Sequence, residues 1–117
     1  KLSSRPQRGR FRQQAEFVVW GSNGSMPVDR GVGCLPGVFR AANVQGSERI
    51  HQTQKPLDVM RQVVQICVPG GRILDPFAGS GTTLAAAAEE GFDAVGIEAH
   101  MTIAKAAAQR LGIELST

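Results

Sequence analysis

The residues best suited to chemistry lie between positions 75 and 98. Residues 75–83 read DPFAGSGTT, an acid followed by a loop of small residues, and Glu98 closes the next apolar run. Gly79 and Gly81 let the backbone turn sharply and approach a ligand closely, and the first N–H groups of a following helix point into the same space. The loop therefore predicts a site for an anion or a carboxylate.

Two acids flank this loop at the ends of predicted strands. Asp75 follows the run 72–74, and Glu98 follows the run 94–97. Because the carboxyl ends of adjacent parallel strands meet at one edge of a sheet, the two carboxylates can accept hydrogen bonds from an amino group and from ribose hydroxyls. The pair predicts a charged small molecule that contains a nucleoside.

The glycine spacing argues against two common nucleotide-binding loops. A GxGxxG fingerprint that starts at Gly79 needs a third glycine where the chain has Leu84. A P-loop needs Gly-Lys-Ser/Thr, which does not follow. An NAD-dependent oxidoreductase half-domain is therefore disfavoured, although it stays open as an alternative.

Apolar periodicity predicts alternating helices and strands after residue 56. Pro56 fits the first turn of a helix with one apolar face, formed by Leu57, Met60, Val63, Val64 and Cys67. A turn at 68–71 leads into the strand that ends at Asp75. A helix over 81–90, a strand over 93–98 and a helix over 101–111 follow, the last with Ile103, Ala107 and Leu111 spaced to pack on the sheet. This order predicts an α/β fold with a parallel sheet and right-handed crossovers.

Two blocks together resemble a known family. Residues 75–83 closely resemble the DPFxGSGTT signature of DNA methyltransferases that modify adenine N6 or cytosine N4. Residues 51–56, HQTQKP, resemble the H-P-T-Q-K-P block of that family, with Gln52 in place of the usual proline. The order of the two blocks is that of the permuted, beta-type members. The resemblance further disfavours the NAD alternative.

The resemblance implies a partial Rossmann-like methyltransferase domain with S-adenosyl-L-methionine as cofactor. In the family the HPTQKP block lies beside the methionine part of the cofactor, and Thr53 and Lys55 are the matching positions. Glu98 matches the acid that binds the ribose hydroxyls. The other implied cofactor-binding residues are Asp75, Phe77, Ala78, Gly79, Ser80, Gly81 and Thr82.

The first half of the chain has a different character. Residues 1–55 carry nine Lys/Arg against three Asp/Glu, a balance of +6, whereas residues 56–117 carry four against seven, a balance of −3. Residues 15–20, which include FVVW, predict a strand buried on both faces with Trp20 in the core. Residues 21–50 are rich in glycine and have no periodicity, which is typical of a functional or disordered loop.

A basic first half indicates a polyanionic partner, and the resemblance implies double-stranded DNA. By position, residues 21–50 correspond to the variable region through which these enzymes read DNA. Solvated charges on a linker are the alternative for each single arginine. The candidate DNA-binding residues are Arg8, Arg10, Arg12, Arg30, Arg40 and Arg49. We therefore expect the chain to consist of a basic segment, residues 1–50, and a cofactor-binding half-domain, residues 51–117.

The catalytic tetrapeptide of this family is absent from the sequence. The family places Asp/Asn/Ser-Pro-Pro-aromatic against a flipped-out base, whereas every proline here is single. No catalytic residue is therefore assigned, and we expect the chain alone to have no turnover. Because it begins with Lys1, we expect a piece of a longer enzyme, completed by its missing N-terminal part or by a second copy. A non-catalytic nucleotide- or DNA-binding remnant that acts through a partner is the alternative function.

Composition limits the remaining possibilities. The 117 residues suffice for one small domain, and no apolar run approaches the length of a membrane span. The start of the chain has no hydrophobic signal region, so a cytoplasmic location is expected. Cys34 and Cys67 have no CxxC partner, which favours reduced, structural thiols over a metal site.

Overall fold

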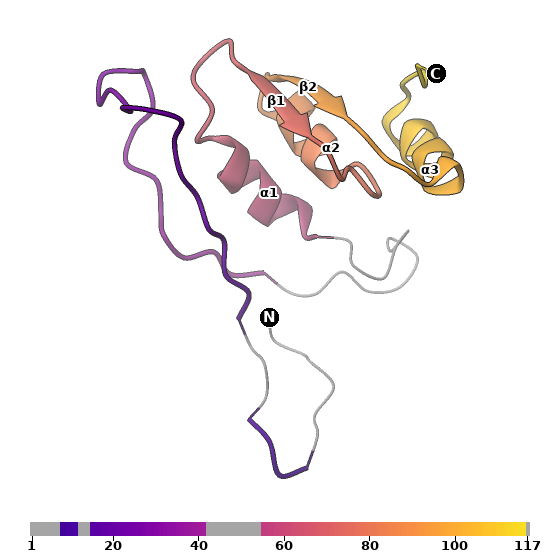
Figure 1. Cartoon of the computed structure of the whole chain (residues 1–117), viewed down its shortest axis with the longest axis horizontal. Coiled ribbons are helices and arrows are strands. Elements are labelled where there is room, and N and C mark those ends of the chain that lie inside the picture. Colours follow the sequence, from indigo (N-terminus) through magenta and orange to yellow (C-terminus); the bar gives the residue numbers. More distant parts are fainter. Residues whose placement is uncertain (1–7, 12–14, 42–54, 117) are drawn as a thin grey trace.

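The computed structural model describes residues 8–11, 15–41 and 55–116. Its helices and strands follow one another as α1 (Leu57–Val64), β1 (Arg72–Asp75), α2 (Thr82–Glu89), β2 (Asp93–Gly96) and α3 (Met101–Leu111). In Figure 1, α1 and α3 lie on opposite sides of α2 and the strand pair. The predicted alternation of helix and strand after residue 56 is confirmed.

The two strands pair in parallel, as the sequence predicts. Arg72 lies opposite Asp93, and Asp75 lies opposite Gly96. Two further bonds extend the pairing past the strand ends: Ile97 N–H donates to the Asp75 carbonyl at 2.8 Å, and Ala78 N–H donates to the Ile97 carbonyl at 2.8 Å. The start of the glycine loop is thereby fixed to the chain that leads to Glu98.

Small side chains allow the helices to approach one another. Helix α2 packs against both strands and against α1, and its Ala86 and Ala87 are completely buried. Val64 of α1 is also buried. An alanine-rich helix keeps a short distance to its neighbours, so a core forms without any large, fully buried side chain in the described part of the chain.

Only one face of the sheet is covered among the described residues. Ile73 and Ala94 are half-buried on the side of α2, whereas their neighbours Leu74 and Val95 point the other way and are 61% and 45% exposed. Leu74 and Val95 are direct partners in the register. Among the described residues, the uncovered face therefore carries an apolar pair, Leu74 and Val95, next to the exposed ion pair of Arg72 and Asp93.

The strand predicted over 15–20 is wrong. These residues form neither helix nor strand, and Trp20 is 71% exposed rather than part of the core. Phe17 and Val19 are more than 90% exposed. A strand needs a neighbour to satisfy its backbone groups, and within the described residues the sheet consists of β1 and β2.

The described part of the 21–50 segment is irregular. Residues 21–41 contain no helix or strand, as predicted for the first part of the 21–50 segment. No helix in the described ranges is long and apolar enough to cross a membrane.

Candidate functional site

The glycine loop between β1 and α2 is a tight turn with two left-handed residues. Gly79 has φ 53° and Gly81 has φ 77°, a region that other residues rarely adopt. The turn closes through a hydrogen bond of 2.8 Å from Gly81 N–H to the Ala78 carbonyl. A Cβ added at Gly79 would meet nothing closer than the Phe77 carbonyl at 3.9 Å. The backbone is therefore open to a ligand at Gly79.

Gly81 faces the protein. A Cβ at this position would lie 2.8 Å from Leu111 Cδ1 and 3.5 Å from Ala107 Cβ, both on α3. The two glycines thus have different functions: one leaves room on the ligand side, and the other allows α3 to pack against the loop.

Asp75 shapes the start of the loop. Its Oδ1 accepts a hydrogen bond from Phe77 N–H at 3.0 Å, a local turn in which an aspartate bonds the backbone two residues ahead. The side chain is half-buried at the carboxyl end of β1. Phe77 is 87% exposed, so it contributes its backbone rather than its ring to the loop.

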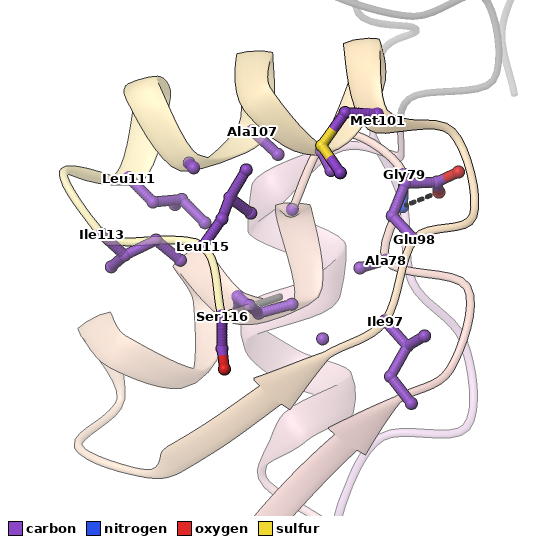
Figure 2. A pocket seen from close by; sticks show the side chains of 15 residues that line it. Ala78, Gly79, Ile97, Glu98, Met101, Ala107, Leu111, Ile113, Leu115 and Ser116 are labelled. Carbon is purple, nitrogen blue, oxygen red and sulfur yellow. Dashed lines mark hydrogen bonds between the residues drawn. The ribbon is translucent and has the colours of Figure 1, made fainter.

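Glu98 connects the loop with the start of α3. Its Oε2 accepts a hydrogen bond from Gly79 N–H at 2.9 Å, and its Oε1 accepts one from His100 N–H, also at 2.9 Å. His100 is the residue that precedes the first turn of α3. The carboxylate predicted at the end of the second strand therefore lies directly beside the glycine loop (Figure 2).

A cavity of about 330 Å³ extends from this point under α3. Ala78, Gly79, Gly81 and Glu98 line it, together with residues of α3 and of the chain after it. Figure 2 shows Leu111, Ile113 and Leu115 gathered at one end and the Glu98–Gly79 bond at the other. The cavity is thus apolar along α3 and polar beside the loop. Such a gradient suits a ligand with one flat apolar part and one charged part.

Ser80 and Thr82 are buried below the loop. Each is 5% exposed, and their hydroxyl oxygens lie 3.3 Å apart, within hydrogen-bond distance. Neither residue lines the cavity. Their side chains therefore support the loop from inside.

The HQTQKP block is only partly described. Thr53 lies outside the described residues. Lys55 is exposed, and its Nζ donates a hydrogen bond of 2.6 Å to Glu16 Oε2. This ion pair joins the first half of the chain to the start of α1, and it places the Lys55 ammonium on Glu16 rather than on the residues that line the cavity.

The six candidate arginines of the first half have different environments. Arg8, Arg10 and Arg40 are exposed. Arg30 is half-buried, and its Nη1 donates to the Ile66 carbonyl after α1 at 2.8 Å. Arg12 and Arg49 lie outside the described residues. Arg8, Arg10 and Arg40 are thus accessible to a polyanion, whereas Arg30 already has a partner in the protein.

Two features of the site were missed by the sequence analysis. Arg110, in the last turn of α3, donates from Nη1 to the Ser80 carbonyl at 3.0 Å. The segment after α3 contributes Ile113, Leu115 and Ser116 to the cavity. Neither feature has a local sequence signal, except that a basic residue in the last turn of a helix is common.

No group of three or more His, Cys, Asp or Glu in the part of the chain that the structure describes is arranged to hold a metal ion. Cys34 is an exposed free thiol, and Cys67 is a half-buried one.

Comparison with known proteins gives a consistent result. The model of the DNA methylase family, the N6 and N4 methyltransferases, matches residues 12–109. That range includes both sequence blocks and all five helices and strands except the last two residues of α3.

Individual relatives are longer than this chain. The type II methyltransferase M.HindIII of Haemophilus influenzae is 46% identical over 65 residues, which are 55% of this chain and 21% of that protein. M.ScaI of Streptomyces caespitosus is 43% identical over 77 residues, 64% of this chain and 25% of that protein. A crystal structure of M1.HpyAVI with SAM has a TM-score of 0.54 and 37% identity, and covers 59% of this chain and 35% of that one. The matched part of the chain thus corresponds to about a fifth to a third of the length of these relatives.

Proposed function

We propose, because this chain belongs to the DNA methylase family, that it is the cofactor-binding part of a DNA methyltransferase. The complete enzyme transfers a methyl group from S-adenosyl-L-methionine to adenine N6 or cytosine N4. The observation that carries the proposal is that the glycine loop and Glu98 line one cavity and are bonded to each other, while Asp75 holds the start of the same loop. A related protein of similar fold is crystallised with this cofactor.

The residues present fit such a cofactor. The open backbone at Gly79 leaves room for the methionine part at close range, and in this proposal Glu98 would accept hydrogen bonds from the ribose hydroxyls. Asp75 holds the start of the loop and would offer a negative charge to the amino group. The apolar wall under α3 suits the adenine ring. The bound cofactor supplies the methyl group, and these side chains bind and orient it.

Transfer of the methyl group needs residues that this chain lacks. No Asp/Asn/Ser-Pro-Pro-aromatic tetrapeptide occurs in the sequence, so the chain alone binds the cofactor without turnover. The same absence supports a second candidate, a non-catalytic nucleotide- or DNA-binding module that acts through a partner.

In this proposal the two halves of the chain, which differ in charge, have different functions. Residues 51–117 form the cofactor-binding half-domain, and residues 1–50 contact double-stranded DNA through exposed arginines such as Arg8, Arg10 and Arg40. Another polypeptide segment, either the rest of a longer enzyme or a second copy, covers the apolar face at Leu74 and Val95. We also propose a cytoplasmic location, because a DNA methyltransferase must reach its DNA substrate.

Calorimetric titration with S-adenosylhomocysteine, the reaction product, tests the cofactor site. We expect the unmodified chain to bind it, and Asp75→Asn and Glu98→Gln to weaken binding about tenfold or more, since each removes a charged acceptor. Asp93→Asn is the matched control, because it removes a carboxylate from the same sheet at a side chain that is 79% exposed and bonded only weakly, with 3.7 Å to Arg72.

Circular dichroism establishes that each variant is folded. A folded, unmodified chain without affinity for S-adenosylhomocysteine contradicts the cofactor-binding proposal and favours the non-catalytic module. Methyl incorporation into duplex DNA by the purified chain would contradict the proposed lack of turnover.

A further inference from the structure

Arg110 reaches from α3 to the buried part of the glycine loop. Its Nη1 donates to the Ser80 carbonyl at 3.0 Å and lies 3.5 Å from Thr82 Oγ1. The Thr82 hydroxyl in turn lies 3.3 Å from the Ser80 hydroxyl. Because Ser80 and Thr82 are both 5% exposed, these bonds connect the arginine to groups that water does not reach easily.

The opposite end of α3 holds the same loop through an acid. Glu98 accepts from Gly79 N–H and from His100 N–H at the start of the helix. Two consecutive residues of the loop, Gly79 and Ser80, are therefore bonded from the two ends of one helix by side chains of opposite charge. We propose that Arg110 is a positioning residue of the cofactor site: with Glu98, it fixes the conformation of the glycine loop that receives the methionine part of the cofactor.

The loop needs such restraints. Glycines gain conformational freedom in the absence of a Cβ, so a turn that contains Gly79 and Gly81 at positive φ has many competing conformations. One backbone bond, from Gly81 N–H to the Ala78 carbonyl, closes the turn from within. The Ser80 carbonyl takes no part in that bond, and Arg110 Nη1 donates to it from α3.

Helix dipoles alone do not account for the position of Arg110. Arg110 lies in the last turn of α3, where a positive charge is favourable, but it also lies at the first turn of α2, where a positive charge is unfavourable. The two effects oppose each other, so the arginine gains little from the helix dipoles. Its charge-assisted bond to the Ser80 carbonyl is the specific interaction at this position.

The test uses two ligands and rests on the proposed cofactor function. S-adenosylhomocysteine carries the amino-acid part that the loop receives, whereas 5′-methylthioadenosine lacks it. We expect Arg110→Met to weaken binding of S-adenosylhomocysteine about tenfold and of 5′-methylthioadenosine by about twofold or less. Arg110→Lys retains the charge and one donor direction, so it restores part of the loss.

Lys105→Met is the matched control. Lys105 is an exposed base on α3, and its replacement removes the same charge without touching the loop. We expect its affinity for both ligands to equal that of the unmodified chain. Equal losses for both ligands in Arg110→Met, accompanied by a lower melting temperature and no recovery in Arg110→Lys, would show a merely structural role and overturn the proposal. An unchanged affinity in Arg110→Met overturns it as well.

Amide hydrogen exchange in the ligand-free chain separates this inference from the function. Arg110→Met should accelerate exchange of the Gly81 amide, which closes the turn, about tenfold. The Phe92 amide, bonded to the Ala87 carbonyl at the far end of α2, should be unaffected. If the unmodified chain binds no S-adenosylhomocysteine, the cofactor proposal fails and the exchange rates alone decide the role of Arg110: faster exchange at Gly81 supports it, and unchanged exchange contradicts it.

Discussion

At the scale of single residues, the two acids of the site have a structural function of their own. Asp75 accepts from Phe77 N–H, and Glu98 accepts from two backbone N–H groups. A loop-capping function and a ligand-binding function are not exclusive, because an ionised carboxylate has about four acceptor positions. The same bonds that preorganise the loop therefore keep the Glu98 carboxylate beside the cavity and the Asp75 carboxylate at the start of the loop.

Gly96, the last residue of β2, gives a prediction about stability. An added Cβ would lie 2.9 Å from Ala78 Cβ and 2.8 Å from Leu84 Cδ1. Ala78 Cβ is fixed to the backbone of the glycine loop and cannot rotate away. We expect Gly96→Ala to reduce the free energy of unfolding by about 1–3 kcal/mol through overpacking, measured by urea denaturation.

Gly33→Ala is the control for that substitution. Gly33 also lacks a positive φ, and a Cβ there would meet nothing within 4 Å, so we expect a change within about 0.5 kcal/mol. Similar losses in both variants would mean that the effect is general to glycine replacement and that the contacts of Gly96 with Ala78 and Leu84 are not the cause.

At the scale of elements, local periodicity predicts the helices well. The sequence predicts a helix over 101–111, and α3 has the same bounds; α2 lies within the predicted 81–90. The predicted strand 93–98 is two residues too long: β2 ends at Gly96, and Ile97 and Glu98 bond to the end of β1 and to the glycine loop. Residues 15–20 have the composition of a strand but no partner among the described residues. Helices depend on bonds within a segment, whereas strands depend on a second segment that composition does not specify.

The same contrast between local and long-range contacts applies to the residues of the site. The acids and glycines that follow β1 and β2 are adjacent to recognisable strands, so the sequence predicts where they lie in the fold. The bond from Arg110 to Ser80 joins residues 30 positions apart, and it depends on how α3 crosses the loop. No periodic pattern encodes such a crossing, and a lone arginine in a last helical turn has many ordinary explanations.

The contact between α1 and α2 gives a prediction at this scale. Arg61 Nε donates to Glu90 Oε1 at 2.7 Å, and Gln65 Nε2 also bonds Glu90. The hydrogen bond and the charge of Glu90 raise the pKa of Arg61 above its ordinary value. We expect Glu90→Ala to lower the melting temperature by a few degrees, because it removes both bonds between the helices.

Glu89→Ala serves as the comparison. Glu89 lies 3.4 Å from the same Arg61 nitrogen, but its side chain is 47% exposed, against 20% for Glu90. A negative charge at the end of α2 also opposes the helix dipole. We expect no loss of stability for Glu89→Ala in thermal denaturation followed by circular dichroism. An equal loss in both variants would assign the effect to charge in general.

At the scale of the whole molecule, the sheet formed by the described residues has one covered face and one uncovered face. Helix α2 packs on the side of Ile73 and Ala94, and the opposite side exposes Leu74, Val95 and Ile97. Phe77, 87% exposed, follows directly after β1. Apolar surface of this kind is typical of an interface. It is consistent with a chain whose matched part corresponds to about a fifth to a third of the length of its relatives.

Charge is also unevenly distributed along the chain, and this distribution determines how DNA binding should depend on salt. The first 55 residues carry +6, and the remainder carries −3. Each arginine that neutralises a phosphate releases counterions, so the negative slope of log K against log salt loses about 0.9 in magnitude when that contact is lost. The slope therefore counts phosphate contacts independently of the sequence of the duplex.

We expect Arg8→Gln, Arg10→Gln and Arg40→Gln each to reduce the magnitude of this slope by about 0.9 in fluorescence anisotropy with a labelled duplex, since all three side chains are exposed. Arg30→Gln should change it less, because its guanidinium already donates to the Ile66 carbonyl. Arg72→Gln is the control: its side chain is 71% exposed but lies on β1 beside Asp93, in the acidic half of the chain. A slope whose magnitude decreases equally for Arg72→Gln would mean that DNA responds only to net charge, and the first half of the chain would then have no special part in DNA binding.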